Sequence, residues 1–133
     1  MDKQYQKPLA SEPPYKKLDE LLDWWAAVEP ERCQYSEDLE FEEPWYTISF
    51  ETGRVHIEFK KATQEDHALL QASVQKTVES KGWFWSILHA SKGVYRAGVK
   101  ISERYVSETG RFPAHALLAA YLKALELTQK NHP

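Results

Sequence analysis

The residues best suited to contact a charged partner are aromatic and basic side chains between positions 83 and 104. Three consecutive aromatic residues precede four cations that are spaced along the following segment. On an extended strand Arg96 and Lys100 share one face. A sheet face with cations and exposed rings can bind single-stranded nucleic acid through phosphate contacts and base stacking. The candidate macromolecule-binding residues are therefore Trp83, Trp85, Lys92, Arg96, Lys100 and Arg104.

The two tryptophans of this set also fit buried positions. Trp83 and Trp85 share strand parity with Ile87, and such a row is typical of the core side of a sheet. The whole chain has a formal net charge of −3, whereas nucleic-acid-binding proteins are usually basic. Both interpretations stay open at the level of sequence.

An acidic segment offers a second candidate surface. Five acids lie within residues 34–44, and three more lie on the preceding predicted helix. They could present negative charge to a basic protein or imitate a phosphate backbone. A solvated connector is the alternative, because charged side chains are mostly exposed. The candidate acidic interaction patch is Glu37, Asp38, Glu40, Glu42 and Glu43.

No pattern in the chain predicts catalysis, a cofactor or a metal. The five histidines form no pair at spacing i, i+4, and the single cysteine has no companion at ligand spacing. The five glycines are isolated, which excludes a phosphate-binding loop. Nearby carboxylates would raise the pKa of Cys33, so we interpret it as an unreactive thiol. We expect no catalytic, cofactor-binding or metal-binding residues.

The N-terminal part predicts an arm, a helix and a connector. Residues 1–13 are polar and predict a loose arm, and Pro14 suits the first turn of a helix. Apolar side chains recur at helical spacing from Leu18 to Val28, and Pro30 ends the run. Residues 34–44 predict an acidic connector. We expect residues 14–130 to form one domain that includes this connector.

Two adjacent runs predict an antiparallel hairpin. Apolar and polar residues alternate along 45–50 and again along 54–60, which is typical of half-buried strands. Gly53 lies in the intervening turn, where a residue that tolerates positive φ is favoured.

The C-terminal half predicts two helices and further strands. Thr63 can cap a helix that Gly82 ends, and Pro113 opens a final helix with one apolar face. Residues 83–90 and 94–101 predict strands, and 103–107 a shorter fifth strand. The predicted order is α-β-β-α-β-β-(β)-α. We therefore expect an α+β fold with one mostly antiparallel sheet of four or five strands and helices packed on it.

Charge is distributed unevenly along the chain. Residues 1–66 sum to −8 and residues 67–133 to +5. This asymmetry fits either a charged partner or an acidic half that lies across the basic half of the same fold. A single cysteine excludes an internal disulfide, and no apolar run reaches membrane-spanning length. Together with the polar first residues, this predicts a soluble cytoplasmic protein.

The layout of residues 63–126 matches a known pattern of elements. A helix ends at Lys81-Gly82-Trp83 and leads into a strand at 84–89; a second strand lies at 95–101, and an Ala- and Leu-rich helix follows Pro113. This layout resembles the phage ABA sandwich family. The final helix lacks the Cys-Arg pair of that family, and the hairpin at 45–60 is additional. The resemblance implies an α/β sandwich of phage origin and carries over no catalytic residue.

Elimination leaves a binding protein as the leading hypothesis. The sequence predicts a non-enzymatic accessory or inhibitory protein, of phage or prophage origin, that binds a host or phage macromolecule. A protein partner is the first expectation. The alternative is a nucleic-acid-binding domain that uses the basic and aromatic face, with an exposed Trp83 or Trp85 for stacking. We expect no membrane partner, and an enzyme ranks third.

Overall fold

The computed structural model describes residues 16–36, 45–50, 53–57 and 62–130. These residues form three α-helices and six strands, which confirms the predicted α+β class. The elements in chain order are α2 (Leu18–Val28), β1 (Cys33–Ser36), β2 (Trp45–Phe50), β3 (Gly53–Ile57), α3 (Gln64–Ser80), β4 (Phe84–Ser91), β5 (Val94–Ile101), β6 (Arg104–Gly110) and α4 (Pro113–Lys130).

The strands form two antiparallel three-stranded sheets, ordered β1-β2-β3 and β4-β5-β6. The prediction of one sheet with four or five strands was therefore wrong. The strands divide into two sheets because α3 is long: its 17 residues span about 25 Å at 1.5 Å per residue. This helix carries the chain across the molecule, so β4 begins in a second sheet.

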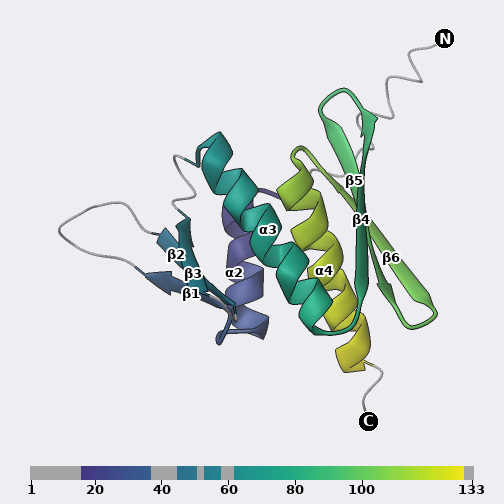
Figure 1. Ribbon diagram of the computed structural model, residues 1–133, viewed down its shortest axis with the longest axis horizontal. Helices are drawn as coiled ribbons and strands as arrows, with labels where there is room; N and C mark the ends of the chain where they lie inside the picture. The colour runs from purple at the N-terminus through teal and green to yellow at the C-terminus, as the bar shows by residue number, and fades with distance from the viewer. Residues whose placement is uncertain (1–15, 37–44, 51–52, 58–61, 131–133) are drawn as a thin grey trace.

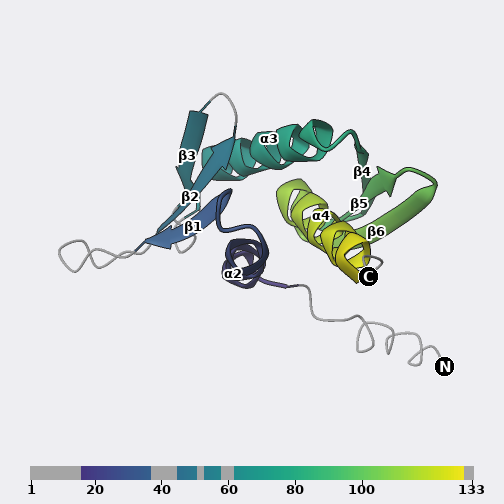
Figure 2. The ribbon, with the colours of Figure 1, turned by 90° about the horizontal axis from the view of Figure 1, so that it is seen from below.

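The helices lie in a layer between the two sheets (Figures 1 and 2). Helix α4 packs on the β4-β5-β6 sheet, α2 contacts β1, and α3 contacts strands of both sheets. The buried side chains of both halves join in one hydrophobic cluster, with Trp25, Tyr46 and Tyr121 among its largest members. One face of the β4-β5-β6 sheet is therefore covered by helices.

Three boundaries differ from the sequence predictions by more than one residue. Residues 34–36 belong to β1 and not to an acidic connector; a four-residue strand is too short to show a clear alternation in sequence. Helix α2 begins at Leu18, later than the predicted start near Pro14. The final strand of the second sheet reaches Gly110 and is longer than expected. The predicted arm at 1–13 and the rest of the connector, 37–44, lie outside the described residues.

The predicted ends of α3 are confirmed. The hydroxyl oxygen of Thr63 accepts a hydrogen bond from the Asp66 backbone N–H at 3.1 Å, while the Asp66 carboxylate accepts one from the Thr63 N–H at 3.0 Å. This reciprocal cap satisfies two donors at the start of the helix. After the helix, Gly82 adopts a φ of 78°, a left-handed conformation that glycine tolerates best. The chain then turns directly into β4.

A buried carboxylate joins the three helices at one point. Glu29, at the C-terminal end of α2, is only 6% exposed. It accepts hydrogen bonds from Trp25 Nε1 at 2.9 Å and from the Tyr121 hydroxyl at 2.6 Å, and its second oxygen lies 3.1 Å from Lys81 Nζ. Burial alone would raise the pKa of Glu29, but the bonds from Tyr121, Trp25 and Lys81 outweigh it and keep that pKa below its ordinary value.

Removing this carboxylate should destabilise the whole fold. We expect Glu29→Ala to lower the free energy of unfolding by about 3–5 kcal/mol, because it leaves a charged and two polar partners unpaired. Glu29→Gln should cost less, because it keeps one acceptor. The measurement is chemical denaturation followed by tryptophan fluorescence, with Glu31→Ala at the neighbouring exposed acid as the matched control. Equal stability of the Glu29→Ala and Glu31→Ala variants would contradict the assignment.

Candidate functional site

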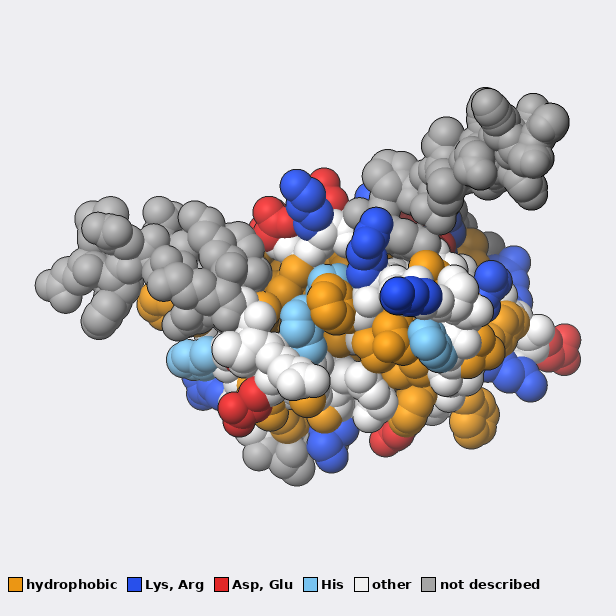
Figure 3. All heavy atoms as spheres, turned by 90° about the horizontal axis from the view of Figure 1, so that it is seen from above, with side chains coloured by type: hydrophobic (Ala, Val, Ile, Leu, Met, Phe, Trp, Pro, Cys, Tyr) orange, Lys and Arg blue, Asp and Glu red, His pale blue; other side chains and the backbone are white. Residues whose placement is uncertain are grey.

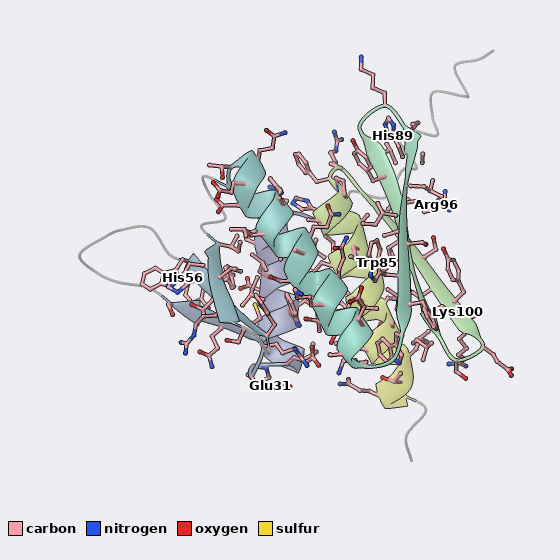
Figure 4. The ribbon with its side chains drawn as sticks, viewed as in Figure 1. Glu31, His56, Trp85, His89, Arg96 and Lys100 are labelled. Carbon is pink, nitrogen blue, oxygen red and sulfur yellow. The ribbon has the colours of Figure 1, made fainter. Side chains whose placement is uncertain are left out.

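The six residues predicted for macromolecule binding do not share one face. Arg96 and Lys100 lie on the side of the β4-β5-β6 sheet that points away from the helices, whereas Trp85 lies between the sheet and the helices (Figure 4). The register explains the division: Trp85 pairs with Val99, and Lys100 with Phe84. Side chains of neighbouring strand residues point to opposite faces of the sheet. Lys100 and its neighbour Val99 therefore lie on different faces, and so do Arg96 and its neighbour Ala97.

The two tryptophans belong to the helix side of the sheet, so the expected stacking on an exposed Trp83 or Trp85 needs correction. Trp83 packs against Tyr121, with ring centroids 6.1 Å apart. Trp85 is half-buried and donates from Nε1 to the Glu79 carboxylate at 2.9 Å. Both rings therefore contact the helical layer. This agrees with the interpretation that placed the two tryptophans on the core side of the sheet.

The solvent side of this sheet, which we call the outer face, has three rows of paired residues. Its first row carries two aromatic rings beside a lysine, its middle row has only small residues, and its third row combines a leucine with an arginine. The rows across β4, β5 and β6 are Phe84, Lys100, Tyr105; Ser86, Gly98, Ser107; and Leu88, Arg96, Thr109.

Three large apolar side chains of the outer face are exposed. Phe84 is 69% exposed, Tyr105 60% and Leu88 54%. None of the helices and strands in the described ranges covers them. These three residues are absent from the binding set predicted from the sequence. The signal was present in the alternation itself, since Phe84 and Leu88 have the strand parity opposite to Trp85.

Gly98 at the centre of the outer face allows a close approach by Tyr105. The Tyr105 ring lies over the Gly98 backbone, so a β-carbon at residue 98 would overlap the ring. The Tyr105 hydroxyl lies 3.4 Å from Ser86 Oγ, which places the ring across β5 towards β4. The middle row is therefore small because an aromatic side chain from the first row occupies the space above it.

The charge of the outer face is positive. Arg96 and Lys100 are its ionisable side chains other than Tyr105, and both are exposed. Lys92 lies in the β4–β5 turn, and Arg104 is the first residue of β6. Arg104 alternates with Tyr105 and so belongs to the helix side of the sheet. Both cations are exposed at the ends of the sheet. Glu103, in the β5–β6 turn, is the adjacent acid. Of the four predicted cations, two therefore lie on the outer face and two lie at the ends of the sheet.

A second cluster lies where α3 and α4 begin. The His67 ring stacks on Phe112 with centroids 4.4 Å apart, and His115 lies 5.1 Å from His67. Figure 3 views this end of the molecule, where histidine side chains lie among hydrophobic ones. His67 Nδ1 and His115 Nε2 are buried without a hydrogen-bond partner. Within the described residues no group of three or more His, Cys, Asp or Glu side chains could hold a metal ion.

The remaining candidates are buried or undescribed. The Cys33 thiol is buried 3.6 Å from the Leu22 carbonyl oxygen, and burial, together with the charge of Asp23, raises its pKa to about 12. It is thus a poor nucleophile. All five residues of the predicted acidic patch fall within 37–44, outside the described residues. Among the described helices, none is long and apolar enough to cross a membrane.

Comparison of the chain with models of known protein families gave no match, and neither did comparison with curated proteins. The resemblance to the phage ABA sandwich family stays a prediction.

The histidine pair should make stability depend on mild acid. Burial, with a contribution from His67, lowers the pKa of His115 to about 4; burial also lowers the pKa of His67, against the opposing effect of Asp66. The unfolded chain therefore binds more protons below about pH 6.5, and stability falls as pH decreases from there to about 4.

We expect the wild type to lose up to about 1.4 kcal/mol per pH unit over this interval relative to His115→Phe, which removes the titrating ring. The measurement is chemical denaturation of both proteins at a series of pH values. Parallel stability curves for the two proteins would contradict the assignment.

Proposed function

We propose that this protein is a non-enzymatic accessory or inhibitory protein that binds an anionic macromolecule through the outer face of its β4-β5-β6 sheet. The observation that carries the proposal is the grouping of Phe84, Leu88 and Tyr105 with Arg96 and Lys100 on one exposed face. The helix side of the same sheet buries its apolar residues, so the fold does not need the apolar residues of the outer face for its core.

Exposed apolar groups of this kind favour a binding role. Soluble proteins rarely gather large exposed apolar side chains on one face unless that face binds a partner. On the outer face, Lys100 lies between Phe84 and Tyr105 in the same row. Apolar contacts would supply affinity there, and the cations would select and orient a partner of negative charge.

Glu29 and Cys33 offer no catalytic group to the outer face. Glu29 has three hydrogen-bonding partners inside the fold, and the high pKa of Cys33 keeps its thiol protonated. Neither group points into the outer face. The resemblance to phage ABA sandwich domains supports a phage or prophage origin, and the single buried cysteine fits action in the reducing cytoplasm.

The proposal predicts that charge reversal on the outer face abolishes retention of macromolecules. Tagged wild-type protein and an Arg96→Glu/Lys100→Glu variant would be compared on bacterial lysate, with and without nuclease. The matched control is Arg54→Glu/Lys76→Glu, which changes the same charge at exposed positions on β3 and α3. We expect the wild type and the control to retain the same material and the outer-face variant to lose it.

Retention of the same material by all three proteins would place the interaction elsewhere. Retention of nothing by the wild type would contradict a binding role. Circular dichroism of each variant checks that the fold is intact, since exposed substitutions should change stability by less than about 0.5 kcal/mol.

A further inference from the structure

We infer that the ligand of the outer face is single-stranded nucleic acid. This inference rests on the proposed function, because it names the partner of the same surface. Three features of the described residues carry it: the arrangement of the two exposed rings, the small middle row, and the position of the cations.

The two exposed rings are placed as stacking platforms. Phe84 and Tyr105 occupy the two outer strands in one row and flank Lys100 on the central strand. Neighbouring strands lie about 4.8 Å apart, so the two rings start about 10 Å from each other. Every nucleobase has a flat face that stacks on an aromatic ring, and each such contact contributes about 1–3 kcal/mol without requiring a particular sequence.

The small middle row lets the Tyr105 ring lie close over the backbone of β5. Ser86, Gly98 and Ser107 have small side chains, and the Tyr105 ring lies over Gly98 while the residue stays 60% exposed. A ring held against the sheet backbone gives a base a fixed surface. The serine hydroxyls beside it can donate to or accept from base edges.

The cations are placed to contact phosphates. Arg96 and Lys100 stand four residues apart on the central strand, about 13 Å along its length, and both are exposed. The nine positions of the outer face carry no carboxylate. Glu108 on β6 has the opposite parity and lies 3.8 Å from Lys123 of α4. Lys92 and Arg104 extend the positive charge to both ends of the sheet.

Other occupants fit this surface less well. A second copy of the chain docked through the same face would oppose Arg96 and Lys100 with like charges. A duplex keeps its bases stacked on each other and offers no face to Phe84 or Tyr105. An acidic peptide satisfies the cations but brings no planar group for the two rings.

Binding of a labelled single-stranded oligonucleotide of mixed sequence and about ten nucleotides, followed by fluorescence anisotropy, tests the inference. RNA and DNA of the same sequence form two arms, which report whether the 2′-hydroxyl contributes. The logarithm of the binding constant should fall linearly with the logarithm of salt concentration. The slope should be about −1.4 if Arg96 and Lys100 each neutralise one phosphate, and about −2.8 if Lys92 and Arg104 also do.

Three variants separate stacking from charge. Arg96→Glu/Lys100→Glu should abolish binding. Phe84→Thr/Tyr105→Thr should weaken binding by about 5- to 150-fold per ring but leave the salt slope unchanged, because it removes stacking and no charge. Gly98→Ala should also weaken binding, because the new methyl group displaces the Tyr105 ring while every ring and charge remains. The Arg54→Glu/Lys76→Glu control should bind as the wild type does.

Several outcomes would overturn the inference. These are the absence of oligonucleotide binding, equal affinity for a duplex of the same sequence, tighter binding of a labelled polyglutamate peptide, or full affinity of the Phe84→Thr/Tyr105→Thr variant. If one of these occurs while the outer face still retains lysate material, the inference fails and the proposed function stands. If the outer-face variant also retains the same lysate material as the wild type, both fail.

Discussion

The packing of the three helices depends on the buried carboxylate of Glu29. Glu29 closes α2, and its two oxygens accept from Trp25 of the same helix, from Tyr121 of α4 and from Lys81 at the end of α3. Because burial of an unpaired carboxylate costs several kcal/mol, all three partners must be in place at once. Lys81 is followed by Gly82 and the start of β4, so this ion pair lies next to the point where the second sheet begins.

The two faces of that sheet follow from one alternation. On the helix side, Trp85, Val99 and Val106 form a row that packs towards α4, and on the solvent side the next row is Ser86, Gly98 and Ser107. The core row is bulky because it fills the space under a helix. The solvent row is small because the Tyr105 ring needs the space above Gly98. Neighbouring residues of the same strands are therefore large on the helix side and small on the solvent side.

Much of the fold could be predicted from local patterns. The β2–β3 hairpin, the cap at Thr63, the stop at Gly82 and the apolar face of α4 rest on interactions between residues close in sequence. The division into two sheets could not be predicted, because strand partners are chosen by packing across the helical layer. Strand β1 was missed for a related reason: it has four residues, and its pairing with β2 defines it.

The candidate site was predicted in part. The shared face of Arg96 and Lys100 follows from strand parity, and the structure confirms it. The sequence left two positions open for Trp83 and Trp85, an exposed face or the core, and the structure places both rings on the helix side. Phe84 and Tyr105 become recognisable only when the register of three strands places them beside Lys100. Buried Glu29 had no sequence signal, since its partners are contributed by all three helices.

The most direct test of the binding surface is a two-dimensional NMR titration of isotope-labelled protein with the single-stranded oligonucleotide. We expect backbone amide shifts to concentrate on β5 between Arg96 and Lys100 and on the neighbouring residues Phe84 and Tyr105, with little change in β1, β2 and β3. Shifts confined to the first sheet, or to the end of the molecule around His67 and His115, would contradict the assignment of the outer face as the binding surface.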